Sequence, residues 1–307
     1  MMDRVQVSDE MIDGYKVSAA RKQLWIIELD LLKRLEETCK KYDINYFLLF
    51  GSAIGAVRHK GFIPWDDDID LGMLREDFDK FLKADKSDWP SYIDIQYGIS
   101  EHGADCLLRI RDGRTTGIIC DEKNRMGNKG VFIEIYPFDY VNDNKLRTRQ
   151  IKASQFLKGC MSCCYMPIEE LSVKSKLKRV MVRCLGINHA WRLYEKVCKL
   201  QNTIETTYVD TITLPEYAAT RHHLFYKEDV MESVYKEFEY TEVRIPIGYD
   251  RCLTTRYGNY MKLPPLEERG THHSFEVYYD PYVSYTEYEN SDIPTRYFSG
   301  DISLEKL

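Results

Sequence analysis

The chain has 307 residues, of which 44% are hydrophobic and 30% charged, and its formal net charge is −6. This length allows one large or two small hydrophobic cores, and the acidic balance argues against a general nucleic-acid binder. The first residues, MMDRVQV, lack the apolar core of a signal peptide, and no stretch reaches the ~20 apolar residues of a membrane-spanning helix.

Nine cysteines are scattered along the chain without the spacing of a disulfide framework. We therefore predict a reducing, cytoplasmic location. Cys160, Cys163 and Cys164 resemble half of a zinc site, with Cys184 and Cys198 as candidates for the other half. Thiols packed between helices are the simpler interpretation.

Apolar residues at helical spacing after Ser18 predict a helix over 19–42, with Ser18 as its N-cap. The apolar run 46–50 then predicts a buried strand.

A small turn at Gly51-Ser52 separates this strand from a short helix predicted over 53–57. Such a turn lets backbone N–H groups approach a phosphate, and the N-terminus of the following helix favours an anion. We therefore predict phosphate binding here. Three cationic side chains that follow are further candidates: Arg58, His59 and Lys60.

Four acids follow Trp65 within five residues: Asp66, Asp67, Asp68 and Asp70. In a strand predicted over 68–73, Asp68 and Asp70 point to the same side, while Ile69 and Leu71 face the core. Paired carboxylates suit Mg²⁺ or Mn²⁺. An acidic surface loop is the alternative, but the apolar neighbours and the cationic run favour a metal site for phosphoryl transfer.

Further elements are predicted after this acidic segment. Residues 75–84 read as a helix, and residues 107–111 and 115–120 as the strands of a hairpin that turns at Asp112-Gly113.

Residues 131–136 form a strong strand pattern that ends at Pro137 and contains Glu134. A buried Glu is costly unless it is paired or bound to metal, so Glu134 is a candidate third carboxylate beside Asp68 and Asp70. The alternative is a Glu on the solvent side of the strand.

Residues 145–208 have a helical pattern, in which five cationic residues surround Leu177 and Val180. Such a basic amphipathic helix can contact an anionic membrane, although a solvated helix face is the simpler interpretation. The remaining residues read as short strands and loops.

Three groups of residues together resemble the LicD-type phosphotransferase family, which includes the fukutin-related proteins. The first is Gly51-Ser52 with the run from Ala56 to Asp70. The others are the segment from Val131 to Asp139, and the segment from Tyr257 to Pro265. Many members have Gly or Thr at the position of Ser52 and Asp at that of Glu134.

This resemblance implies a nucleotidyltransferase-like α/β (α+β) fold, a mixed sheet flanked by helices. It also implies transfer of a substituted phosphate from a CDP-linked donor to a glycan hydroxyl. CDP-choline is the expected donor, and lipopolysaccharide, teichoic acid or capsule the acceptor. One or two Mg²⁺ or Mn²⁺ ions, and no organic cofactor, would be held by Asp68, Asp70 and Glu134. Trp65, Asp66, Asp67, Arg109 and His272 are supporting candidates.

We expect a catalytic core over 19–144, a helical segment over 145–210 and a C-terminal substrate lobe over 211–307. Peripheral contact with the inner membrane surface is a further hypothesis. A nucleotidyltransferase that attaches a nucleotide is the main alternative. An RNA-modifying enzyme and a non-catalytic glycan-binding protein are others, disfavoured respectively by the net charge and by the three carboxylates.

Overall fold

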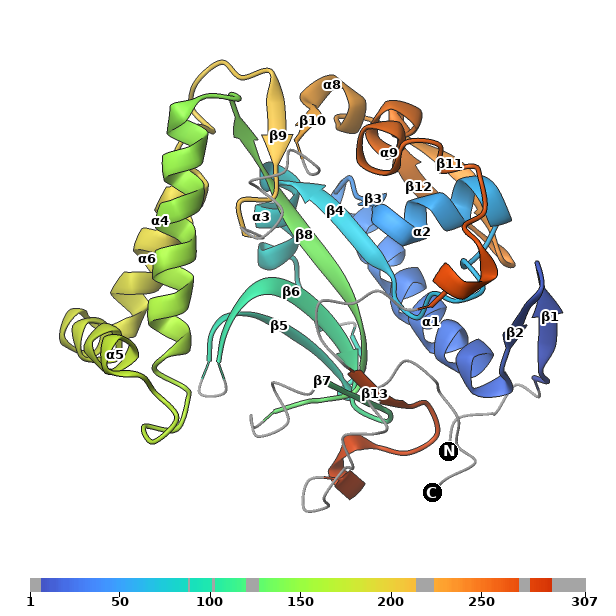
Figure 1. The fold of residues 1–307 in the computed structure, drawn as a ribbon, viewed down its shortest axis with the longest axis horizontal. Coiled ribbons are helices and arrows are strands. Elements are labelled where there is room, and N and C mark those ends of the chain that lie inside the picture. The colour runs from blue at the N-terminus through green and yellow to red at the C-terminus, as the bar shows by residue number, and fades with distance from the viewer. Residues whose placement is uncertain are drawn as a thin grey trace.

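The computed structural model describes residues 7–87, 89–100, 103–119, 127–213, 224–270 and 277–288 (Figure 1). Its centre is a seven-stranded mixed sheet built around the long strand β8 (Val131–Val141). Strand β4 (Asp70–Leu74) runs parallel to one edge of β8. Along the opposite edge lie β6 (Ala104–Asp112) and then β9 (Tyr208–Asp210), both antiparallel to β8. The mixed sheet predicted from the family resemblance is confirmed.

The other strands extend this sheet or form small sheets of their own. The three outer strands of the main sheet are β3 (Phe47–Leu48), β5 (Ile93–Ile99) and β10 (Phe225–Tyr226). Three two-stranded antiparallel sheets pair β1 (Glu10–Ile12) with β2 (Tyr15–Val17), β11 (Ser233–Phe238) with β12 (Thr241–Pro246), and β7 (Thr116–Ile119) with β13 (Val277–Asp280).

Strand β8 continues through Pro137, so the predicted strand end at that residue is wrong. The N–H of Glu134 donates to the carbonyl of Ile69 on the β4 side. Because successive N–H groups alternate between edges, the nitrogen of Pro137 faces the other edge. There the pairing with β6 ends at Ile135 and that with β9 begins at Asp139. Proline is tolerated because it lies in this gap, where no ladder hydrogen bond is required.

The predicted hairpin over 107–120 is also wrong, although the chain does turn tightly after Asp112, whose carbonyl accepts from the N–H of Thr115. The two edges of β6 are already occupied by β5 and β8. Strand β7 therefore pairs elsewhere, with β13 near the end of the chain. Cys120, at the end of the predicted second strand, lies outside the described residues.

Helix α1 (Ala19–Tyr42) has the predicted bounds, and the side chain of Ser18 accepts from the N–H of Arg21 as its N-cap. Its apolar side chains share the main core with residues of β4, β6 and β8. The core side of the sheet includes Ile69 and Leu71, as predicted. The other helices next to this sheet are α2 (Phe50–Ile54), the π-helix η1 (Gly55–His59) and α3 (Arg75–Lys83).

Helices α4 (Lys145–Ser162), α5 (Val173–Leu185) and α6 (Ile187–Cys198) form a group at one side of the sheet (Figure 1). They pack around a second apolar cluster that includes Cys160 and Cys198. The predicted helical stretch is confirmed for these three helices, whereas residues 163–172 and 199–207 are turns and loops and Tyr208 begins β9. None of the helices in the described ranges is long and apolar enough to cross a membrane.

The C-terminal residues return to the main core, which contains Phe238, Val243 and Leu253. Their helices are α8 (Lys227–Val230), α9 (Tyr249–Tyr257), and two short 3-10 helices, η3 (Leu266–Glu268) and η4 (Tyr285–Tyr288). The sequence pattern did not predict α9. The domain boundaries at 144 and 210 stay predictions.

A buried ion pair joins α3 to β8, and we expect the fold to depend on it. Arg75 donates to the carboxylate of Asp139 through two hydrogen bonds of 2.8 and 2.7 Å, and both side chains are buried. Asp139→Ala would leave the buried guanidinium with only the longer contact to Asp79, at 4.0 Å, and should lower the free energy of unfolding by about 3–5 kcal/mol. Urea denaturation measures this loss. Lys16→Ala, which breaks the exposed pair with Asp9, is the control and should cost less than about 1 kcal/mol.

Candidate functional site

A row of charged side chains crosses three neighbouring strands of the main sheet. Asp70 on β4 is the register partner of Glu134 on β8, and Glu134 is the register partner of Arg109 on β6. Register partners point to the same face of a sheet, on strands about 4.8 Å apart. The opposite face of β8 belongs to the apolar core, which contains Ile133 and Ile135. The two carboxylates predicted from the sequence therefore lie side by side.

Two hydrogen bonds compensate the charge of Glu134, which is only 5% exposed. Arg109 Nε donates to Oε1 at 2.7 Å, and the hydroxyl of Tyr136 donates to Oε2 at 2.9 Å. Burial, followed by the charges of Asp70 and Glu134, raises the pKa of Tyr136 well above its usual value, which keeps this hydroxyl protonated. Tyr136 was not predicted as a site residue, although its position two residues after Glu134 places both on one face of the strand.

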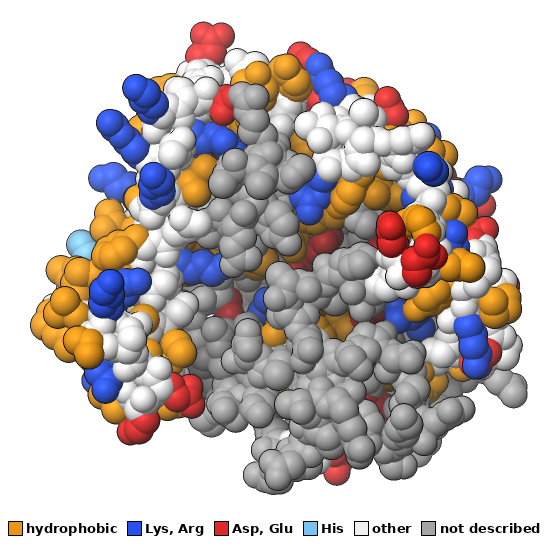
Figure 2. Space-filling model, in the orientation of Figure 1, with side chains coloured by type: hydrophobic (Ala, Val, Ile, Leu, Met, Phe, Trp, Pro, Cys, Tyr) orange, Lys and Arg blue, Asp and Glu red, His pale blue; other side chains and the backbone are white. Residues whose placement is uncertain are grey.

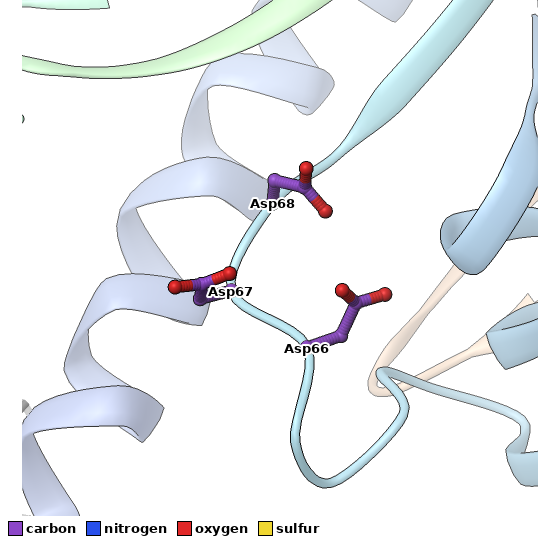
Figure 3. Close-up of side chains that lie close together, drawn as sticks. All are labelled: Asp66, Asp67 and Asp68. Carbon is purple, nitrogen blue, oxygen red and sulfur yellow. The ribbon is translucent and has the colours of Figure 1, made fainter. Parts of the chain in front are cut away.

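The acidic loop before β4 brings three carboxylates together (Figure 3). Asp66, Asp67 and Asp68 each have a ligand oxygen within 4.8 Å of the others. Figure 3 shows Asp67 turned toward the neighbouring helix, and Asp66 and Asp68 on the other side of the loop. Asp68 precedes the first residue of β4, so the strand starts two residues later than predicted.

Gly51 and Ser52 lie in the first turn of α2, so the prediction of a separate turn is wrong. Phe50 has a positive φ of 47° and leads the chain directly from β3 into the helix. The Ser52 hydroxyl accepts from the N–H of Asp70 at 2.9 Å and lies 3.4 Å from the carbonyl of Asp68, to which it donates. A Cβ on Gly51 would lie 2.4 Å from Oδ2 of Asp66. Both small residues thus let the acidic loop pack against α2.

Helix α1 holds the other side of the acidic loop. Arg21 Nη1 and Trp25 Nε1 donate to the carbonyl of Asp66 at 2.9 and 3.0 Å. One turn further along the same helix face, Glu28 is fully buried, and neither of its carboxylate oxygens has a hydrogen-bond partner. Burial and then the charges of Asp68, Asp67 and Asp66 raise the pKa of Glu28 well above its usual value.

The sequence analysis did not predict Glu28 as a site residue, because the apolar periodicity of α1 indicates only which side chains face the core. Arg21, Trp25 and Glu28 are spaced at i, i+4 and i+7, which places them on one face of a helix. That spacing was the available signal. It could not show that the acidic loop packs against this face.

Arg58 and His59 connect the segment after α2 to distant parts of the chain. Arg58 Nη1 donates to the carbonyl of Tyr260 at 2.6 Å, and His59 Nδ1 lies 3.2 Å from Oδ2 of Asp13. Burial, reinforced by the neighbouring Arg58, lowers the pKa of His59. Phosphate binding by these side chains stays a prediction.

Two further candidates also have protein partners. Lys60 forms an exposed ion pair with Glu237 at 3.0 Å, and Trp65 is buried, with the guanidinium of Arg269 4.9 Å from its ring centroid. His272 lies outside the described residues.

Helix α9 packs against α2, and its last residue, Tyr257, begins the third group of the family resemblance. The guanidinium of Arg256 lies 4.2 Å from the ring centroid of Phe50. Burial raises the pKa of Tyr257 to about 12, and the charges of Asp70 and Asp66 contribute to that rise. Residues nearly 200 positions apart in the chain therefore share one electrostatic environment.

The acidic loop fits a divalent cation chemically. Its three closely spaced carboxylates are hard oxygen ligands of the type that Mg²⁺ and Mn²⁺ prefer. Among the described residues, Asp66, Asp67 and Asp68 are the group whose three ligand atoms lie within 4.8 Å of one another, and no group of that kind includes a cysteine. The trio predicted from the sequence, Asp68, Asp70 and Glu134, is not such a group in this structure. Cys160 and Cys163 are instead buried thiols, as the packing interpretation predicts.

Comparison with known proteins agrees with this arrangement. Residues 43–171, which include the acidic loop, β4 and β8, match the family model described as "LicD/FKTN/FKRP, nucleotidyltransferase domain". Over these residues the chain is similar to the LicD family. The resemblance inferred from the sequence motifs is thereby confirmed.

Individual relatives match to different extents. The lipopolysaccharide cholinephosphotransferase LicD of Haemophilus influenzae is 29% identical over 272 residues, which cover 86% of this chain and 98% of that protein. An uncharacterised protein of Rickettsia typhi is 30% identical over 142 residues, 46% of this chain and 43% of that protein. An uncharacterised protein of Rickettsia prowazekii is 41% identical over 73 residues, 24% of this chain and 26% of that protein.

Ser52→Ala should weaken both the fold and the site. It removes the acceptor of the Asp70 N–H in a buried environment, and we expect the free energy of unfolding to fall by about 1–3 kcal/mol. Ser154→Ala is a matched control, because that buried hydroxyl bonds the carbonyls of Ile151 and Ile212 in the helical group. Urea denaturation should show a loss in both variants, whereas Mn²⁺ affinity should fall only in Ser52→Ala. Equal Mn²⁺ affinity in both would contradict the role given to Ser52.

Glu28→Gln should stabilise this protein increasingly as pH rises. The raised pKa means that the folded state holds the Glu28 proton more tightly than the unfolded state. Wild-type stability is therefore lost as pH rises from the ordinary glutamate pKa toward the raised one, and glutamine removes this loss. Thermal unfolding in EDTA at pH 5 and pH 8 measures the difference. Glu37→Gln, an exposed position of the same helix, should show no such trend. A Glu28→Gln effect that is independent of pH would disprove the assignment.

Proposed function

We propose that this protein transfers phosphocholine from CDP-choline to a hydroxyl of a cell-surface glycan, with lipopolysaccharide as the first acceptor to test. The observation that carries the proposal is the register of Asp70 with Glu134, directly after the acidic loop and within the residues that match the LicD family. The nearly full-length similarity to a lipopolysaccharide cholinephosphotransferase supports the choice of group and acceptor.

We assign Mg²⁺ or Mn²⁺ binding to Asp68, Asp70 and Glu134, with Asp66 and Asp67 adding negative charge beside them. A carboxylate has about four lone-pair sites, so Glu134 can keep its bonds to Arg109 and Tyr136 and still face a cation. When bound, such an ion would neutralise the pyrophosphate of the donor and stabilise the charge of the leaving group.

The remaining chemistry belongs to the protein's own side chains. The oxygen of the acceptor hydroxyl bonds to the phosphorus of phosphocholine, the bond from that phosphorus to the CMP oxygen breaks, and CMP leaves. Asp70 or Glu134, the two carboxylates of this row, receives the hydroxyl proton. Arg109 lies in the same row and contributes positive charge next to the phosphate.

The donor is recognised in part by the segment over α2 and η1. The first-turn N–H groups of α2 suit phosphate oxygens, since its N-cap residue Leu49 provides no side-chain cap. We propose Arg58, His59 and Lys60 as further contacts of the donor. CDP-ethanolamine, CDP-ribitol and CDP-glycerol are the competing donors, and teichoic acid and capsule the competing acceptors. We place the reaction in the cytoplasm.

The test is CMP release with Mg²⁺ or Mn²⁺ from each of the four CDP-linked donors, with and without lipopolysaccharide. Wild-type protein should release CMP from CDP-choline, and Asp68→Asn should lower the rate by about a hundredfold or more through lost charge at the site. Asp77→Asn on α3, away from the site, is the matched control and should leave the rate unchanged.

Product analysis separates the transferase from the nucleotidyltransferase alternative that the family description also names. Phosphocholine on the acceptor together with free CMP supports our proposal. Pyrophosphate release from a nucleoside triphosphate, with the nucleotide attached to an acceptor and no CMP from any CDP-linked donor, would replace it.

A further inference from the structure

Helix α5 carries a stripe of apolar side chains that faces solvent. Val173 is 85% exposed, Leu177 72% and Val180 56%, and Cys184 is also exposed. These positions are spaced at i, i+4, i+7 and i+11, so they fall within about 60° of one another around the helix axis. Val182, on the opposite side, is the buried residue of this helix.

This arrangement is the reverse of that in an ordinary surface helix, which turns its apolar stripe toward the core. Helix α5 packs on α4 and α6 through Val182 and the half-buried Met181. Within the part of the chain that the structure describes, its more regular apolar stripe stays exposed. An exposed apolar patch of this kind marks an interaction site.

The charge of α5 indicates which partner fits. The helix contains five cationic residues and no acid: Lys174, Lys176, Lys178, Arg179 and Arg183. Lys176 and Arg183 lie along one border of the apolar stripe and Lys174 along the other, and all three are exposed. The nearest acids along the chain, Glu169 and Glu170, precede the helix.

Neighbouring residues enlarge the apolar surface. Met166 and Ile168, in the loop before α5, are 43% and 49% exposed, and Leu185 at its end is 56% exposed. Figure 2 shows apolar and cationic side chains together over the region of α5, at the left of the molecule. Arg179 donates to the carbonyl of Met166 at 2.7 Å and so fixes this loop against the helix.

We propose that α5 docks this protein on a membrane surface that contains anionic lipids. The apolar stripe enters the boundary between headgroups and acyl chains, and the flanking cations contact the anionic headgroups. A protein partner fits less well, because lysine is depleted at protein interfaces, whereas two of the three cations that border this stripe are lysines. The inference does not rest on the proposed transferase reaction.

Docking of this kind would leave the catalytic sheet away from the bilayer contact. Figure 1 shows α5 at the outer end of the helical group, with α4 between it and the sheet. An enzyme held in this way meets acceptors that are attached to lipid at a high local concentration.

The experiment is sedimentation of the full chain with vesicles of phosphatidylcholine alone or of phosphatidylcholine with phosphatidylglycerol. We expect binding to the anionic vesicles that weakens at high salt. In the double variant Leu177→Ser/Val180→Ser, the affinity for anionic vesicles should fall at least about tenfold, because less apolar surface is buried in the membrane. In Lys174→Ala/Lys176→Ala, the affinity for anionic vesicles should fall about fivefold per lysine, whereas any affinity for phosphatidylcholine vesicles should not change.

A matched control replaces two exposed apolar residues outside the helical group, Met11→Ser/Met231→Ser, and should bind as the wild type does. Light scattering without lipid accompanies each measurement. Absence of vesicle binding by the wild type, or an equal loss in the control, would overturn the proposal. So would a dimer that is separated by Leu177→Ser/Val180→Ser, which would assign the stripe to a second copy of the chain.

Discussion

Charge compensation among closely packed carboxylates is the constraint on which this structure depends. The parallel register of β4 and β8 places Asp70 beside Glu134, and the acidic loop adds three more aspartates next to them. Arg109 and Tyr136 donate hydrogen bonds to the carboxylate of Glu134, and the hydroxyl of Ser52 accepts one from the N–H of Asp70. These hydrogen bonds order the row but leave a concentration of negative charge. That remaining charge is the basis of the divalent-cation site that we propose.

The position of the acidic loop is determined from two sides. Helix α2 provides small residues against which the loop can pack, and α1 provides Arg21 and Trp25, which bond the carbonyl of Asp66. Glu28 lies behind the loop without a hydrogen-bond partner and so opposes the stability of the apo fold. A cation bound at the proposed site would offset this cost, because a ligand that binds only the folded state stabilises it.

The helical group is organised by a different force. Its inner surface buries an apolar cluster, as any globular unit does, but α5 also exposes a second stripe whose borders are cationic. The sequence pattern predicted a basic amphipathic helix and favoured a solvated face. The structure adds the orientation of this helix: the regular apolar positions Val173, Leu177 and Val180 face outward. The sheet and the helical group thus present two separate surfaces, one acidic and one apolar with basic borders.

By itself the sequence determined what local spacing can encode. This includes the bounds of α1, the core positions of Ile69 and Leu71, the strand character around Glu134 and the resemblance to the LicD family. Only the tertiary structure decided which strands pair. It therefore decided that β7 joins β13, that β8 passes through Pro137 and that Arg109 meets Glu134. Alternation and helical periodicity arise within one segment, whereas pairing partners and buried charge pairs depend on residues far apart in the chain.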